Sequence, residues 1–188
     1  MASVLVLTAS PSITSRTSAL AHHVADELVL SGHDVRVVDL RDLPAAALLA
    51  ADTSAPQVLD AVQALLASDG VIVATPIYKA SYSGLLKVFL DLLPQRALEG
   101  KVVLPLATGG TVAHLLAIDY SLRPVLVSLG AAHITTGRFV LDQHIDHRSG
   151  GPLLVDETTR QCVARTADAF RAALQDARDH RPALVVPA

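Results

Sequence analysis

The sequence SVLVLTASPSITSRTS, residues 3–18, contains the pattern that indicates the fold. Its first part has a continuous apolar centre of valine and leucine, as in a strand that is buried on both faces of a parallel sheet. A polar turn follows, and apolar residues then recur at helical spacing from about residue 15 to residue 30. Gly32 comes directly after this stretch, where glycine often ends a helix. These residues therefore predict a strand, a loop and a helix.

The same unit repeats along the chain. Further strands are predicted at residues 34–40, 70–74, 101–107 and 132–140, the last with a break at Gly137. Further helices are predicted at residues 56–67, 83–92, 111–129 and 158–177. Strands that alternate with helices through short connections specify a parallel sheet covered on both faces. We therefore expect one α/β domain over residues 1–188, with a doubly wound five-stranded parallel sheet in the flavodoxin-like order 2-1-3-4-5.

The composition excludes several classes of protein. The chain has 188 residues, of which 51% are hydrophobic and 18% charged, so it is too apolar for a disordered protein and fits a packed domain. A net charge of −3 gives no electrostatic reason to expect nucleic acid or an anionic membrane as a partner. No apolar run reaches the roughly 18–20 residues of a membrane span. The single cysteine, Cys162, cannot form an intrachain disulfide, and we expect a cytoplasmic protein.

The loop after the first strand is rich in hydroxyl groups. In doubly wound sheets ligands bind beyond the carboxyl ends of the strands, near the point where the strand order reverses. Residues 9–18 contain six serine or threonine residues and Arg16, but no glycine, whereas the motifs for triphosphates and dinucleotides require glycine. Hydroxyl groups, the N-terminus of a helix and one arginine suffice for a single phosphate. The loop predicts a monophosphate site, although helix capping alone would explain one or two of the hydroxyl groups.

The loops after the third and fourth predicted strands are candidates for the rest of a ligand site. Residues 74–84, ATPIYKASYSG, contain two of the three tyrosines, and Pro76 restricts the backbone there. Backbone N–H groups and Tyr78 or Lys79 could border a planar ligand, and an ordinary hydrophobic turn is the alternative. In residues 107–111, ATGGT, the glycines allow the backbone to approach a ligand closely, although turns often contain such a pair.

Three segments together resemble a known family. They are SPSITSRT at residues 10–17, TPIYKASYSGLLK at residues 75–87 and LATGGTVAHLLAIDYSLRP at residues 106–124. They are similar to the NADPH-dependent FMN reductases of two-component monooxygenase systems, especially those of the alkanesulfonate type. The resemblance covers most of residues 3–140. It implies an NAD(P)H:FMN oxidoreductase with FMN and NADPH or NADH as cofactors, a flavin-dependent monooxygenase as partner, and a homotetramer or homodimer.

The resemblance also implies roles for individual residues. The phosphate of FMN would be bound by Ser10, Ser12, Ser15, Arg16, Thr17 and Ser18. One side of the isoalloxazine ring would be bordered by Pro76, Ile77, Tyr78 and Lys79, and the other side by Gly109, Gly110 and Thr111. Hydride passes directly between two stacked rings in such a reaction, so we expect no catalytic acid or base from the protein.

The helix predicted at residues 111–129 should be irregular. Pro124 lacks an N–H group, so the carbonyl of Tyr120 loses its usual helical partner. In the reductases that this chain resembles, a tyrosine is inserted in a π-helical bulge at a tetramer interface, and Tyr120 has the matching position. The alternative is a simple proline kink with Tyr120 in the core.

Two other functions and a metal site are the alternatives to this hypothesis. A quinone or azo-dye reductase of the same fold would retain FMN, and a flavodoxin-type electron carrier would lack a nicotinamide site. Electron carriers of that type are usually strongly acidic, which this chain is not. His144 and His147 lie near Asp142 and Asp146, but their spacing fixes no third ligand, and we predict no metal site.

Overall fold

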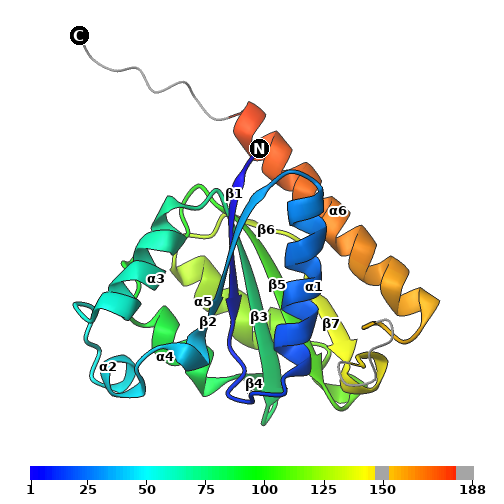
Figure 1. The fold of residues 1–188 in the computed structure, drawn as a ribbon, viewed down its shortest axis with the longest axis horizontal. Helices are drawn as coiled ribbons and strands as arrows, with labels where there is room; N and C mark the ends of the chain where they lie inside the picture. The colour runs from blue at the N-terminus through cyan, green and yellow to red at the C-terminus, as the bar shows by residue number, and fades with distance from the viewer. Residues whose placement is uncertain (147–152, 181–188) are drawn as a thin grey trace.

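The computed structural model describes residues 1–146 and 153–180, and the strands in this part of the chain form one sheet (Figure 1). Five parallel strands follow one another in the order β2 (Asp34–Asp39), β1 (Ser3–Thr8), β3 (Gly70–Tyr78), β5 (Val102–Gly109) and β6 (His133–Ile134). Two further strands are β7 (Arg138–Leu141), parallel to β5, and β4 (Ser81–Tyr82), antiparallel to β3.

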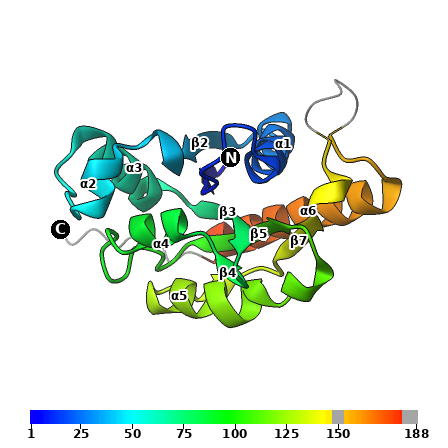
Figure 2. The same cartoon turned by 90° about the horizontal axis from the view of Figure 1, so that it is seen from below.

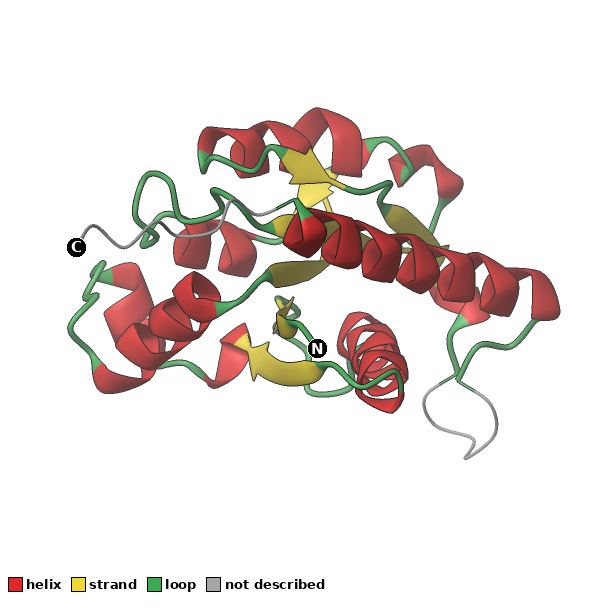
Figure 3. Cartoon of the chain, turned by 90° about the horizontal axis from the view of Figure 1, so that it is seen from above, coloured by secondary structure: helices red, strands yellow, loops and turns green. Residues whose placement is uncertain are grey.

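Helices cover both faces of this sheet (Figures 2 and 3). One face packs against α1 (Arg16–Leu30) and α6 (Glu157–Asp179). The other face packs against α2 (Ala45–Leu49), α3 (Pro56–Ala67), α4 (Gly84–Leu90) and α5 (Arg123–Ser128). No helix in the described part of the chain is long and apolar enough to cross a bilayer.

Alternation along β1 explains why its sequence is continuously apolar. Leu5 and Leu7 point into the cluster under α3, α4 and α5, whereas Val4 and Val6 point into the cluster under α1 and α6. Both faces of the strand are therefore buried, as the pattern predicted. In the observed register Thr8 is level with Asp39 of β2 and Ala74 of β3. The loops that follow these strands thus leave the sheet from one edge.

The predicted doubly wound topology is confirmed, with two differences in the strands. The predicted fifth strand is divided into β6 and β7, which both pair with β5. The division falls at Gly137, where a Cβ atom would lie 2.9 Å from Cγ2 of Ile118, so this backbone packs closely against the neighbouring helix. The second difference is β4, a two-residue hairpin strand that the sequence did not indicate.

Two strands are longer than predicted. β3 continues through Pro76 to Tyr78, and β5 continues to Gly109, so parts of the two expected loops belong to the sheet. Pro76 lies beyond Ala74, the last residue of β3 that pairs with β1, so its missing N–H group falls where the pairing with β1 has ended. The predicted connection at residues 41–55 contains α2, a helix of five residues that the sequence did not indicate.

The predicted helix at residues 111–129 is irregular, as expected. It consists of a short 3-10 turn at Val112–His114, a π-helix at Ile118–Leu122 and then α5. Tyr120 lies within the π-helix and is 80% exposed. The alternative that places Tyr120 in the core is therefore wrong.

Candidate active site

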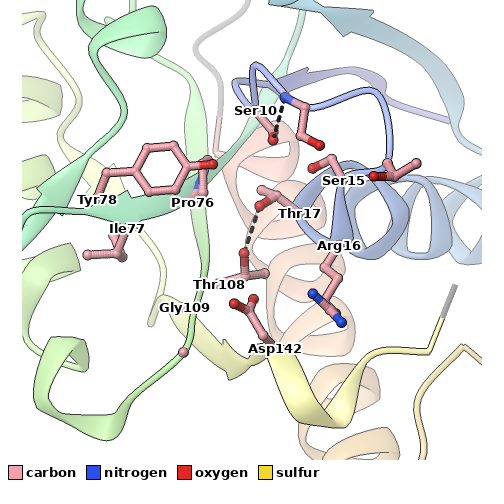
Figure 4. A pocket seen from close by; sticks show the side chains of 13 residues that line it. Ser10, Ser15, Arg16, Thr17, Pro76, Ile77, Tyr78, Thr108, Gly109 and Asp142 are labelled. Carbon is pink, nitrogen blue, oxygen red and sulfur yellow. Dashed lines mark hydrogen bonds between the residues drawn. The ribbon is translucent and has the colours of Figure 1, made fainter.

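A cavity of about 310 Å³ lies at the carboxyl edge of the sheet (Figure 4). Three segments that are distant in the sequence line it: the loop after β1 with the first turn of α1, the end of β3, and the end of β5. Asp142, which follows β7, completes the lining. The lining residues are Ser10, Ser12, Thr14, Ser15, Arg16, Thr17, Pro76, Ile77, Tyr78, Thr108, Gly109, Gly110 and Asp142.

The first wall of the cavity is a hydroxyl-rich helix N-terminus. Ser15 caps α1, because its side chain accepts a hydrogen bond of 3.0 Å from the backbone N–H of Ser18. The hydroxyl groups of Thr17 and Thr108 are 2.7 Å apart, which joins α1 to β5 across the cavity floor. No acidic residue lies in the first turn of α1, so the positive end of the helix dipole is not neutralised there. This wall is suited to bind an anion.

Arg16 adds a positive charge to the same wall. It is exposed, and its Nε donates a hydrogen bond of 3.3 Å to the backbone carbonyl of Ile145. This bond fixes the direction of the side chain and leaves the two Nη groups without a hydrogen bond to the described residues. Arg16 therefore has donors available for a ligand oxygen.

A network of hydrogen bonds supports the loop from behind. Asp39 at the end of β2 accepts hydrogen bonds from Thr8 at 2.6 Å and from Arg41 at 3.2 Å. Arg41 also donates a hydrogen bond of 2.7 Å to the backbone carbonyl of Ser12, so it connects the loop to β2. Ser18, which was predicted to bind phosphate, has its hydroxyl 2.6 Å from that of Thr8. Ser18 thus belongs to this network and is not among the lining residues.

The second wall is formed by the end of β3 and the hairpin that follows. Lys79 and Ala80 have φ angles of 50° and 62°, which give the two-residue turn between β3 and β4. Pro76, Ile77 and Tyr78 line the cavity, whereas Lys79 lies at the tip of the hairpin, is exposed, and is not among the lining residues.

A serine connects this second wall to the first. The backbone N–H of Ser83 donates a hydrogen bond of 2.9 Å to the hydroxyl of Thr75. The hydroxyl of Ser83 donates a hydrogen bond of 2.6 Å to the carbonyl of Ala9. The same hydroxyl caps α4 by accepting a hydrogen bond from Leu86. The end of β3 and the loop after β1 are therefore held at a fixed separation.

The third wall consists of backbone from the end of β5. At Gly109 a Cβ atom would lie 3.1 Å from the ring of Phe139, so this position has little room for a side chain. At Gly110 a Cβ atom would meet no protein atom within 4 Å, which leaves open space on the cavity side. Thr111 caps the 3-10 turn by accepting a hydrogen bond from Ala113 and is not among the lining residues.

Three lining residues were not predicted. Thr14 lies in the hydroxyl-rich loop, so the composition of that loop already contained its signal. Thr108 lies beside the glycine pair and is placed by the unexpected length of β5. Asp142 comes from a segment to which the sequence assigned no function, and nothing local in the sequence indicates that it reaches the cavity.

Within the described residues there is no group of three or more histidine, cysteine or acidic side chains that could hold a metal ion. Nδ1 of His144 is 2.6 Å from Asp156, the residue that caps α6. Hydrogen bonds from the backbone and side chain of Thr159, with a smaller contribution from His144, lower the pKa of Asp156 to about 2. His147 lies outside the described residues.

Comparisons with known proteins agree with the class that this fold and cavity define, a flavodoxin-like oxidoreductase. Residues 2–146 match the family model of NADPH-dependent FMN reductase. An FMN reductase (NADPH) of Escherichia coli strain K12 is 50% identical over 144 residues, which cover 76% of this chain and 74% of the relative. One of Pseudomonas putida is 41% identical over 180 residues, 95% of this chain and 90% of the relative.

A solved structure is similar over nearly the same length. The crystal structure of an NADH:FMN oxidoreductase, EMOB, in its apo form has a TM-score of 0.85 and 43% identity, and the match covers 92% of this chain and 90% of that one. This chain belongs to the family of NADPH-dependent FMN reductases. It is therefore an oxidoreductase that uses FMN together with NADPH or NADH.

Proposed function

We propose that this reductase binds FMN as an exchangeable substrate, reduces it with NAD(P)H, and releases it to a separate flavin-dependent monooxygenase. The observation that carries the proposal is the single cationic side chain, Arg16, among the described residues that line the cavity. One exposed arginine at a helix N-terminus gives a phosphate site of moderate strength. A moderate affinity suits a flavin that must leave, and the resemblance to reductases of two-component systems supports the same conclusion.

The first wall of the cavity fits the phosphate of FMN. In this proposal Arg16 and the hydroxyl groups of Ser10, Ser12, Ser15 and Thr17 bind the phosphate at the N-terminus of α1. Ser18 acts indirectly, by holding α1 against Thr8. The hydrogen bonds behind the loop would hold these donors in place around the phosphate.

The other two walls fit a planar ring. Pro76, Ile77 and Tyr78 would border one side, and the backbone of Gly109 and Gly110 would border the other. When bound, FMN supplies the chemistry, because its ring accepts a hydride from a reduced nicotinamide. The task of the chain is then to orient the two rings at a separation of roughly 3–3.5 Å. Tyr78 is 49% exposed, so it lies where the nicotinamide would approach.

We also propose that the chain assembles as a homotetramer or homodimer through the segment that contains Tyr120. Large apolar side chains are exposed along this segment, namely Val112, Leu115, Leu116 and Tyr120. Adjacent exposed apolar side chains are typical of protein interfaces. Deletion of Tyr120 should therefore reduce the mass measured by light scattering, whereas Leu30→Ala, on an exposed residue of α1, should leave the mass unchanged. Unchanged assembly and flavin binding after the deletion would refute this role.

A cytoplasmic location is part of the proposal, because metabolism inside the cell keeps the nicotinamide coenzyme reduced. The test of the proposed function is the oxidation of NADPH and of NADH in air with no acceptor other than added FMN. We expect a rate that saturates with FMN and protein that is purified nearly colourless. A quinone or azo-dye reductase would be purified yellow, with a rate set by its organic acceptor. An electron carrier would not oxidise NAD(P)H.

A further inference from the structure

Asp142 places a carboxylate in the cavity that the proposed function assigns to FMN. It is the first residue of a 3-10 turn, Asp142–His144, that directly follows β7, and it is partly buried. In Figure 4 its carboxylate is drawn between Thr108 and Arg16. No residue of this turn was assigned a role from the sequence.

The carboxylate of Asp142 has no hydrogen bond or ion pair with any other described residue of the chain. Asp39, behind the same loop, is different, because Thr8, Ser18 and Arg41 all donate to it. The charge of Asp39 is therefore compensated within the protein, whereas the charge of Asp142 faces the cavity. A fixed anion in a shared cavity acts on every charged group that binds there.

The charges of Arg16 and Asp142 cancel formally. They are the two charged side chains among the described residues that line the cavity. A phosphate monoester carries a charge of about −1.5 to −2 near pH 7. Arg16 and Asp142 line the same cavity, and the Debye length is roughly 8 Å at physiological salt, so a phosphate bound beside Arg16 is only partly screened from Asp142. Asp142 therefore opposes the attraction that Arg16 and the helix N-terminus exert.

We propose that Asp142 is a specificity-determining residue that weakens the binding of the flavin phosphate and so keeps FMN exchangeable. The proposal rests on the proposed function, because it assumes that the phosphate binds beside Arg16. Its consequence is that the affinity for FMN is lower than the donors of the first wall alone would give. Riboflavin has the same ring and ribityl chain but no phosphate. Its affinity for the protein therefore does not depend on the charge of Asp142.

The experiment measures equilibrium binding of FMN and riboflavin by flavin fluorescence in the full chain. Asp142→Asn removes the charge and keeps the shape, and Asp142→Ala removes the charge without adding an N–H donor. Both variants should bind FMN about threefold to tenfold more tightly than the unchanged protein at low salt. Their riboflavin affinity should change less than twofold. The gain for FMN should shrink at high salt, because salt screens the interaction.

Asp34→Asn is the matched control, since it removes the same charge from an exposed residue at the amino end of β2. It should leave both affinities unchanged. FMN binding that is unchanged or weaker in both Asp142 variants would overturn the proposal. A gain in Asp142→Asn alone would overturn it too, because a new hydrogen bond would then be the cause. Equal gains for riboflavin would show that Asp142 acts on the ring or the ribityl chain.

The same titrations distinguish this failure from failure of the proposed function. If the unchanged protein binds FMN but the Asp142 variants gain nothing, the role of Asp142 is refuted and the proposed function stands. If the unchanged protein does not prefer FMN to riboflavin at all, the phosphate site itself is wrong. Both proposals then fail together.

Discussion

The two ends of the cavity are built in different ways. At the end near α1, hydroxyl groups, an arginine and a helix N-terminus face the cavity, and hydrogen bonds to Asp39 and from Arg41 brace them. At the end near Gly109, backbone and apolar side chains face it, beside a hairpin with left-handed residues and a π-helix. The first end is suited to recognise charge, and the second is suited to recognise shape.

The two ends of the cavity should therefore respond to different parts of the flavin. Changes at the first end should separate FMN from riboflavin, because only FMN carries a phosphate. Changes at the second end should affect both flavins equally, because both carry the ring. The first three of the following variants test that division by flavin affinity, and the fourth tests stability away from the cavity.

Arg16→Ala should have the largest effect. Loss of charge-assisted hydrogen bonds worth about 1.5–3 kcal/mol weakens FMN binding roughly 10-fold to 100-fold. Riboflavin affinity should change less than threefold. Arg96→Ala, on a highly exposed arginine that pairs with Glu99, is the control and should change neither affinity. Equal losses for the two flavins would show that Arg16 does not contact the phosphate.

Gly109→Ala should lower the affinity for FMN and the affinity for riboflavin by a similar factor. The added Cβ atom would lie 3.1 Å from the ring of Phe139, so either the ring or the end of β5 must move. Overpacking of about 1 kcal/mol corresponds to roughly fivefold in affinity. Gly84→Ala, where the added atom would meet nothing within 4 Å, serves as the comparison. A loss confined to FMN would contradict the assignment of this end to the ring.

Arg41→Ala should weaken flavin binding less than Arg16→Ala does. The loss should again be larger for FMN than for riboflavin. The substitution removes the 2.7 Å hydrogen bond to the carbonyl of Ser12, which braces the loop. One such bond contributes about 0.5–1.5 kcal/mol, so FMN affinity should fall about threefold and riboflavin affinity less than twofold. Arg36→Ala, whose side chain pairs with Asp60, controls for loss of an arginine elsewhere in this part of the chain. If only thermal stability changes, Arg41 does not position the phosphate site.

The substitution Asp156→Asn should have the smallest effect. It should change the stability of the fold and leave flavin binding unchanged. The pKa of Asp156 is lowered from 3.8 to about 2, so the folded state favours the ionised carboxylate. This stabilisation is complete above about pH 3.8 and is lost as the pH falls toward about 2. The melting temperature of Asp156→Asn should be below that of the unchanged protein at neutral pH, and the difference should shrink in that acidic range. A difference that is constant with pH would show that ionisation of Asp156 is not involved.

The sequence predicted most of the fold because its signals are local. The apolar run of β1, the helical spacing in α1 and the alternation of strands and helices specify a doubly wound sheet without knowledge of distant contacts. Pro124 indicated an irregular helix, and Gly137 indicated the break between β6 and β7. The lengths of β3 and β5 were underestimated, because strand ends depend on pairing with neighbours, here with β4 and β7.

The site was predictable where its residues are adjacent in the sequence. Ser10, Ser15 and Arg16 share one loop and its helix, and all three line the cavity. Ser18, which was predicted to bind the phosphate, is not among the lining residues, and its hydroxyl bonds to Thr8 and Asp39, which the sequence does not place beside it. Lys79 and Thr111, which were predicted to border the ring, are not among the lining residues either. Lys79 lies in the hairpin turn, and Thr111 caps a 3-10 turn. Asp142 could not be foreseen, since it lies 125 or more positions along the chain from the residues of the first wall.

In the proposed function the cavity binds FMN, allows its reduction and then releases it. To test this directly, the protein is mixed anaerobically with excess NAD(P)H and a large excess of FMN. The mixture is then ultrafiltered, and the amount of reduced FMN in the filtrate is compared with the amount of protein. We expect many molecules of reduced FMN per protein chain to appear free of protein. Reduction that stops at one flavin per chain, with that flavin retained by the protein, would contradict the account.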